Sequence, residues 1–182
     1  MASIAGYCSA FFERITVVCY WASRVDYSLA RQCTSTLRST IGVTQVYLLD
    51  TNIISELRRV KPHGAVVAWI QSVDDKDLFV SSVTIGEIQA GIEITREQDL
   101  EKADQLEKWL GLVADTYNVI SMDASIFRAW AKLMHKASDT LYEDAMIAAT
   151  AKVHHLIVMT RNIADFRSFG VKLFNPFDGE FY

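Results

Sequence analysis

Acidic residues lie close to the ends of predicted strands in three separate parts of the chain. Asp50 directly follows the apolar run 46–49, Glu87 lies in the first turn of a predicted helix after a strand, and Asp144 opens an alanine-rich helix that precedes another strand. In a parallel α/β sheet such positions meet at one edge. Carboxylates gathered there raise one another's pKa unless a cation neutralises them. The pattern therefore predicts a site for a hard divalent cation, Mg²⁺ or Mn²⁺.

Each acid also has a simpler structural explanation. Asp50 can cap the helix that follows it, and Glu87 can complete a capping box with Thr84. Asp144 can complement the dipole of its helix, and Asp165, in a predicted surface turn, needs no chemical role. The chemical interpretation therefore depends on the set of acids and on no single member.

The elements that must position these acids alternate between strand and helix along the chain. Strands are predicted at 46–49, 78–83, 119–121, 156–159 and 171–174. Helices are predicted at 53–60, 64–72, 84–95, 97–112, 123–134 and 142–154, with a turn or short helix at 163–169. This alternation predicts an α/β domain with a mainly parallel sheet covered by helices on both faces.

Composition restricts the possible classes of protein. A chain of 182 residues that is 51% hydrophobic can bury the core of one domain. The net charge of −4 and the pI near 5.5 exclude a protein that holds nucleic acid mainly through a basic surface. No apolar run reaches the roughly 18 residues that span a bilayer, so we expect a soluble, cytoplasmic protein. The three cysteines all precede residue 34 without CxxC spacing, which predicts neither a disulfide framework nor a zinc site.

The first 45 residues differ in composition from the rest. They contain four arginines, no lysine and two acids, which leaves a charge of −6 for residues 46–182. We favour a translation start assigned too early, with 46–182 as the complete domain. A targeting segment is the alternative, because an Arg-rich, Ser-rich and acid-poor composition is typical of organellar transit peptides, whereas a secretory signal fits poorly.

Four sequence motifs occur in register between residues 46 and 162, and a fifth ends at residue 177. They are Leu48-Leu49-Asp50-Thr51-Asn52, Thr84-Ile85-Gly86-Glu87-Ile88, the segment from Glu143 to Ala151, Thr160-Arg161-Asn162, and Asn175-Pro176-Phe177. With these motifs the chain resembles the PIN-domain toxins of the VapC type, especially the FitB-like branch. The resemblance implies a PIN-like three-layer sandwich whose mainly parallel sheet has the strand order 3-2-1-4-5. It also implies Mg²⁺-dependent endonucleolytic cleavage of RNA.

The resemblance assigns roles to individual residues. Asp50 and Asp144 match the family's main metal ligands, and Glu87 matches the acid that helps to bind metal or to orient water. Thr51 and Asn52 would support Asp50.

The fourth acidic position departs from the family pattern. Many relatives place an acid directly after Thr-Arg, where this chain has Asn162, and the nearest acid is Asp165. Either Asn162 supplies a neutral oxygen in that role, or Asp165 reaches the site from the same turn. We favour Asp165, since relatives with a Thr-Arg-Asn-x-x-Asp-Phe pattern exist.

The predicted reaction is hydrolysis of an RNA phosphodiester, with tRNA or rRNA as the target, by a metal-activated water that leaves a 5′-phosphate and a 3′-hydroxyl. Arg58, Arg59 and Arg161 adjoin the acids and are candidates to steer RNA, although solvated surface charge explains them equally well. The resemblance further implies a small antitoxin as partner and a homodimer, and residues 85–112 could form a helical hairpin that clasps the antitoxin.

Other classes of protein fit less well. A haloacid dehalogenase-type phosphatase requires a second Asp where this chain has Asn52, and a receiver domain needs a central phosphoacceptor and a late lysine that are not in place. The alternative that stays open is a PIN protein with impaired cleavage that binds RNA or an antitoxin, which Asn162 motivates.

Overall fold

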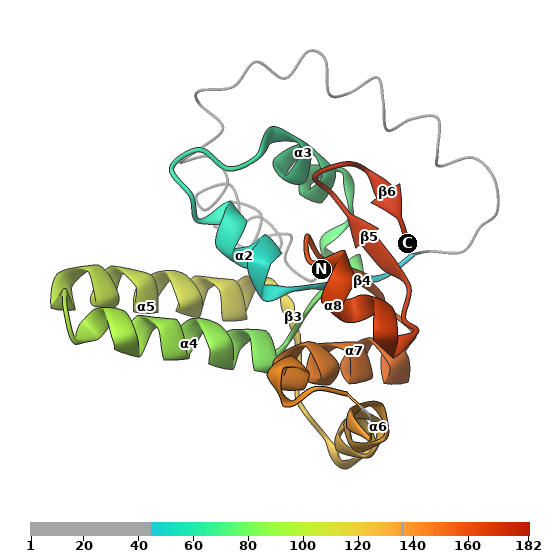
Figure 1. Cartoon of the computed structure of the whole chain (residues 1–182). Helices are drawn as coiled ribbons and strands as arrows, with labels where there is room; N and C mark the ends of the chain where they lie inside the picture. Colours follow the sequence, from blue (N-terminus) through green and yellow to red (C-terminus); the bar gives the residue numbers. More distant parts are fainter. Residues whose placement is uncertain (1–44, 136) are drawn as a thin grey trace, which may run out of the picture. The chain divides into compact units, whose positions relative to one another are not determined.

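The computed structural model describes residues 45–135 and 137–182 (Figure 1). The interpretations offered for the N-terminal extension fall, apart from its last residue, outside the described part of the chain. Among the described residues, no helix combines the length and the apolar character needed to cross a membrane.

A six-stranded sheet forms the centre of residues 45–182. Its strands are β1 (Tyr47–Leu49), β2 (Leu78–Ser81), β3 (Asn118–Ile120), β4 (Ile157–Met159), β5 (Leu173–Asn175) and β6 (Glu180–Phe181), in the order β3-β2-β1-β4-β5-β6. The first five strands are parallel, which confirms the predicted order 3-2-1-4-5. The sixth pairs antiparallel with β5 at the edge and had not been predicted.

Helices connect and cover the strands. They are α2 (Thr51–Leu57), α3 (Gly64–Ser72), α4 (Ser82–Arg96), α5 (Leu100–Thr116), α6 (Ala124–Met134), α7 (Tyr142–His154) and α8 (Ile163–Phe166). Short 3-10 turns occupy Asp75–Asp77, Asp139–Leu141 and Arg167–Phe169.

Neighbouring residues of β1 face opposite layers, as the period of two in a strand requires. Tyr47 and Leu49 pack with residues of α2 and α3, such as Ile53 and Val66, in one hydrophobic cluster. Leu48 packs with α7 and α8 in the other. Helices therefore cover both faces of the sheet, and the three-layer prediction is confirmed. Because β1 lies in the middle, buried on both faces, the residue that follows it is held by the whole core.

The start of α4 differs from the prediction. The strand ends at Ser81 and the helix begins at Ser82, with the Ser81 hydroxyl accepting a hydrogen bond from the amide of Val83 at 3.2 Å. Thr84, proposed as the first residue of a capping box, is instead fully buried inside the helix. Glu87 consequently lies in the second turn and has no capping role. The simpler explanation offered for this acid is therefore wrong.

The helices α4 and α5 form an antiparallel hairpin that extends away from the sheet (Figure 1). Ile92, Ala103 and Leu110 are buried between them. Near the tip, the Arg96 guanidinium binds three carboxylates, two of them from α5, at 2.7 to 3.1 Å. The predicted helical hairpin over residues 85–112 is confirmed, although α5 begins at Leu100, three residues later than expected.

The three tryptophans in the described part of the chain pack against hydrophobic clusters. Trp69 makes an edge contact with Tyr47 at 4.6 Å and also contacts Phe174. Trp109 packs at the base of the hairpin and Trp130 on the α6–α7 side. All three therefore contribute to packing.

The central position of β1 gives a stability prediction. Leu48→Ala should lower the free energy of unfolding by about 2–5 kcal/mol, because the side chain is fully buried and its removal leaves a cavity. Leu100→Ala, at a residue that is 63% exposed, is the control and should change it by less than about 0.5 kcal/mol. Urea denaturation measures both. Equal effects of the two substitutions would contradict the placement of β1 in the core.

Candidate active site

Asp50 is fixed at the junction between β1 and α2. Its amide donates to the carbonyl of Met159 in the neighbouring strand at 3.0 Å, so the sheet ladder extends to this residue. Its carboxylate caps α2, with Oδ1 accepting from the amide of Thr51 at 2.7 Å. The side chain is only 4% exposed. The capping role is therefore real, but the burial of the carboxylate and the contacts of its second oxygen go beyond what a cap requires.

The second oxygen of Asp50 is held by two neutral donors. The Thr160 hydroxyl donates to Oδ2 at 2.6 Å, and the Asn52 amide nitrogen donates to the same oxygen at 2.5 Å. The Asn52 amide also donates to Thr160 Oγ1 at 2.9 Å, and its Oδ1 accepts from the amide of Arg161 at 3.1 Å. This network ties the ends of β1 and β4 together. Burial still outweighs these bonds and raises the pKa of Asp50.

Thr160 is the site residue that the sequence reasoning did not single out. It directly follows β4, and its hydroxyl accepts from the amide of Asn162 at 2.9 Å as well as donating to Asp50. The signal was present in the Thr160-Arg161-Asn162 motif.

Glu87 approaches Asp50 through Thr51. The Thr51 hydroxyl donates to Glu87 Oε2 at 2.5 Å, so residue 51 contacts an acid 36 positions later. The pKa of Glu87 is raised to about 7, because burial and, to a smaller extent, repulsion from Asp50, Asp144 and Glu143 outweigh the hydrogen bond from Thr51, which lowers it. Three acids from other elements therefore act on this carboxylate.

Asp144 lies in the first turn of α7. Burial, together with smaller contributions from repulsion by Asp50, Asp165 and Glu143, raises its pKa to about 6. A helix N-terminus would stabilise a negative charge. The raised pKa shows that burial, together with repulsion from the surrounding acids, outweighs that effect.

The fourth acidic position involves both of its candidates. Asn162 and Asp165 are in contact, with the Asn162 amide nitrogen donating to Asp165 Oδ2. Asp165 is also close enough to raise the pKa of Asp144. The structure therefore places a carboxylate from α8 beside the other acids, and Asn162 orients it.

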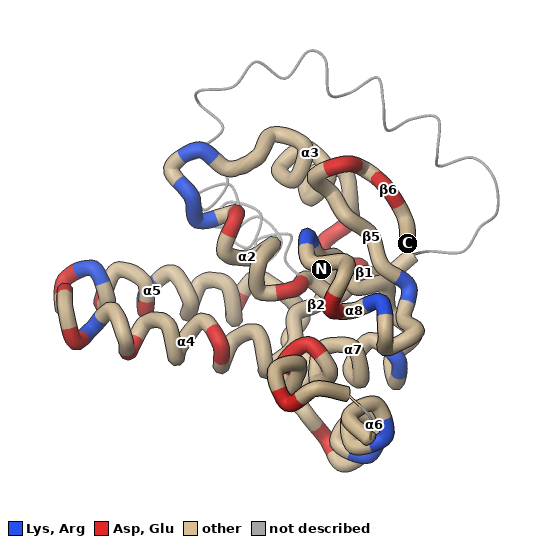
Figure 2. The backbone as a smooth tube through the Cα atoms, viewed as in Figure 1, with Lys and Arg blue, Asp and Glu red and all other residues tan. Residues whose placement is uncertain are grey.

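The acids come from the ends of β1 and from α4, α7 and α8, and Figure 2 shows acidic positions of these elements around one end of the sheet. The causes of the three raised pKa values include no lysine or arginine. Within residues 45–135 and 137–182, no three acidic, histidine or cysteine side chains converge closely enough to enclose a metal ion. An open set of hard oxygens fits Mg²⁺, which keeps several waters and takes one or two protein carboxylates.

The arginines predicted to meet RNA make other contacts. The guanidinium of Arg58 lies 5.7 Å from the Trp109 ring centre, and that of Arg161 lies 5.2 Å from the ring centre of Phe177. Arg59 pairs with the buried Glu56 at 3.0 Å. Each contact holds the cation at the protein surface, and their role in RNA binding stays a prediction.

The fold and these motifs together define a PIN domain. Residues 47–172 match the family model described as PIN domain, and the chain belongs to this family.

Among its relatives, toxin FitB of Neisseria gonorrhoeae is 33% identical over 136 residues, which cover 71% of this chain and 96% of that protein. The VapC ribonuclease Y4jK of Sinorhizobium fredii is 31% identical over 142 residues, covering 72% and 97%. The crystal structure of FitAcB from Neisseria gonorrhoeae superposes with a TM-score of 0.65 at 31% identity, over 72% of this chain and 98% of that one. The resemblance read from the motifs is confirmed.

The raised pKa of Glu87 predicts a specific dependence of stability on pH. A pKa of about 7 in the folded protein, against an ordinary value of 4.5, means that the folded state holds this proton more tightly than the unfolded chain. Ionisation of Glu87 therefore destabilises the metal-free protein, with no effect below pH 4.5 and the full effect once the pH exceeds 7. Calorimetry in EDTA should give Glu87→Gln the Tm of the wild type near pH 4 and a higher Tm at pH 8.

The matched control is Glu101→Gln, at an exposed acid of α5. Its Tm difference from the wild type should be the same at both pH values. A difference for Glu87→Gln that is equally independent of pH would show that this carboxyl group titrates normally.

Proposed function

We propose that this protein is a Mg²⁺-dependent endoribonuclease. The observation that carries the proposal is that Asp50, Glu87, Asp144 and Asp165 lie close enough together for repulsion among them to raise the pKa of Glu87 and Asp144, while no ion pair within the described part of the chain neutralises any of the four. Such a cluster is costly in a free domain and becomes favourable when it binds a divalent cation. The 31% sequence identity to a VapC ribonuclease, over 97% of that protein, supports RNA as the substrate.

The proposed roles follow from the contacts of each side chain. Asp50 and Asp144 would hold the ion, with Asp50 kept in place by Asn52 and Thr160. When bound, Mg²⁺ supplies neutralisation of phosphate charge and activation of a water molecule. Glu87, held by the Thr51 hydroxyl next to Asp50, would position that water. Attack by water leaves a 5′-phosphate and a 3′-hydroxyl, and tRNA or rRNA is the target we expect.

We further propose that the protein is the toxin of a toxin–antitoxin pair and that it forms a homodimer. The relation to toxin FitB supports the toxin role. The α4–α5 hairpin offers a surface for the antitoxin, because Ile94, Leu100 and Leu112 are between 44% and 63% exposed on it. A small antitoxin that covers these side chains would also lie over the hairpin that carries Glu87.

The open alternative is a PIN protein that binds RNA or an antitoxin without cleaving. Asn162 favours it, since an amide replaces the acid that many relatives carry. The contact between Asn162 and Asp165 supports the nuclease, because Asp165 is also close enough to Asp144 to raise the pKa of that acid.

Cleavage assays with Asp144→Asn decide between these functions. The wild-type protein with Mg²⁺ should cleave RNA to products with 5′-phosphates, and EDTA should abolish the activity. Asp144→Asn should lower the rate about 100-fold or more, since a metal ligand contributes several kcal/mol to transition-state stabilisation. Asp115→Asn, the same change at an exposed residue of α5, should retain full activity.

Equal activity of the wild type and Asp144→Asn, insensitive to EDTA, would rule out the proposed nuclease. A 2′,3′-cyclic phosphate product would rule out water as the nucleophile.

Metal binding can also be measured without any RNA. At pH 7.5, Mg²⁺ at ten times its Kd should stabilise the folded protein by about 1.4 kcal/mol, a rise in Tm of about 4 °C. Asp144→Asn should remove most of this rise, and Asp115→Asn should not change it. Differential scanning fluorimetry measures the shift, and a rise that survives in Asp144→Asn would place the ion elsewhere.

A further inference from the structure

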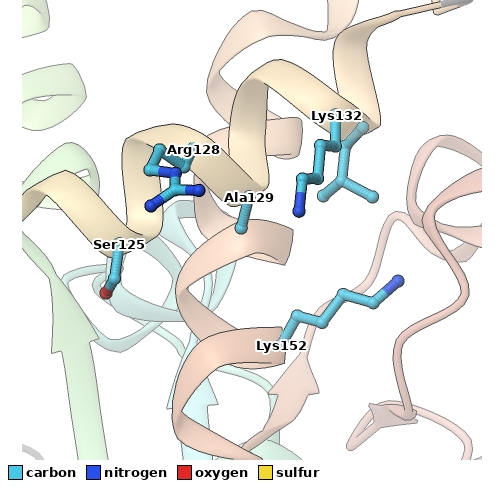
Figure 3. A pocket seen from close by; sticks show the side chains of 6 residues that line it. Ser125, Arg128, Ala129, Lys132 and Lys152 are labelled. Carbon is cyan, nitrogen blue, oxygen red and sulfur yellow. The ribbon is translucent and has the colours of Figure 1, made fainter.

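A groove of about 360 Å³ opens between α6 and α7, outside the cluster of acids (Figure 3). We call it the α6–α7 groove. Five of its lining residues come from α6 and one from α7: Ser125, Arg128, Ala129, Lys132, Leu133 and Lys152.

Three of the six lining residues are cations. Arg128 and Lys132 are four positions apart on α6, so they lie on the same side of that helix, one turn apart. Figure 3 shows Lys132 and Lys152 projecting from the two helices on opposite sides of the groove. All three residues are exposed. The positive charge of the groove therefore comes from two elements and faces a shared space.

These cations are not used in ion pairs within the described part of the chain. Arg59, Lys76 and Arg96 each lie within 4.0 Å of a carboxylate, whereas Arg128, Lys132 and Lys152 do not. Lys152 makes one hydrogen bond, from Nζ to the carbonyl of Phe169 at 3.4 Å. In a segment with a net charge of −6, a groove with three such cations is a local exception.

One acid adjoins the groove at the start of α6. The Asp123 carboxylate accepts hydrogen bonds from the Ser125 hydroxyl at 2.7 Å and the amide of Ile126 at 2.9 Å. These bonds lower its pKa and commit the carboxylate to capping α6. The Asp123 carboxylate forms no ion pair with the cations of the groove, so these cations are available to bind an external anion.

The helix α7 connects the groove with the acids. Asp144 lies in its first turn and Lys152 eight residues later, about 12 Å along the helix axis. A ligand that enters the acidic site and extends past it along α7 would meet the groove. An extended polyanion such as a single RNA strand is long enough to do so.

We propose that the α6–α7 groove binds backbone phosphates of the RNA strand beyond the scissile bond. The proposal rests on the proposed ribonuclease function for its choice of polyanion. The acids repel phosphate, and Arg58 and Arg161 are stacked on aromatic rings beside them. The affinity for a long strand must then come from cations outside the acidic site. The groove supplies three such cations. Their contacts would be to the phosphates of the RNA backbone, which carry no sequence information.

The test compares RNA binding by two variants with the same change in charge. The full chain carries Asp144→Asn to suppress cleavage, and the probe is a fluorescent 20-nucleotide oligouridylate in Mg²⁺ buffer. The groove variant is Arg128→Gln/Lys132→Gln/Lys152→Gln. The control is Lys76→Gln/Lys102→Gln/Lys108→Gln, which removes three exposed lysines elsewhere.

The groove variant should bind the probe at least about tenfold more weakly at 0.1 M KCl, and its plot of log K against log salt should be shallower by about 2, or about 0.7 for each lost phosphate contact. The control should match the parent protein. Lys132→Gln alone should make the slope shallower by about 0.7. Because this variant replaces a single exposed side chain, it can replace the triple variant in the test if the triple variant does not fold.

Equal affinities and slopes for the groove variant and the control would overturn the proposal. The proposal would also be overturned if the groove variant retained its affinity for RNA but lost affinity for an oligoglutamate peptide. That result would make the groove a site for an acidic protein segment. Groove-dependent binding by a protein whose wild type cleaves no RNA would leave the groove assignment standing and refute the ribonuclease alone.

Discussion

The burial of one carboxylate at the end of the central strand is the constraint on which the site depends. Asp50 is held at the point where β1 gives way to α2, with the sheet core on one side and two layers of helices around it. Burying a charge costs several kcal/mol unless hydrogen bonds or an opposite charge offset it. Three donors offset part of that cost here, from Thr51, Asn52 and Thr160. None of them is charged, so the negative charge is oriented but not neutralised.

Two of the other acids repeat this arrangement with less burial. Glu87 is held by the Thr51 hydroxyl and Asp165 by the Asn162 amide. Neutral donors fix positions while leaving the negative potential intact, whereas a lysine or arginine in the same places would have cancelled it. The nearby arginines stack on Trp109 and Phe177. The domain thus keeps its cations off the acids, and the resulting repulsion is the energy that a bound cation would relieve.

The sequence predicted the framework of this site better than its contacts. The alternation of apolar strands and helices predicted the layers, and the motif spacing predicted the strand order through the family resemblance. The beginning of α4 could not be predicted, because Ser81, Ser82 and Thr84 are all residues that cap helices and only tertiary packing chooses among them. Thr84 is excluded as the cap of α4 because it is completely buried, and this burial depends on neighbours remote in sequence. The edge strand β6 has only two residues, too few for a period to be recognised.

The fourth acid shows why a motif read by position alone was insufficient. The sequence offered two candidates for the fourth acidic position, Asn162 and Asp165, because a motif assigns each role to a single residue. In the folded chain the first turn of α8 brings the two side chains into contact, so they share the position as an orienting amide and a carboxylate. With Asn162 neutral, a negative charge still lies near Asp144, because the Asp165 carboxylate is close enough to raise the pKa of that acid. Residues three positions apart on a helix lie on the same side, so a carboxylate one turn further along the chain lies near the position of Asn162.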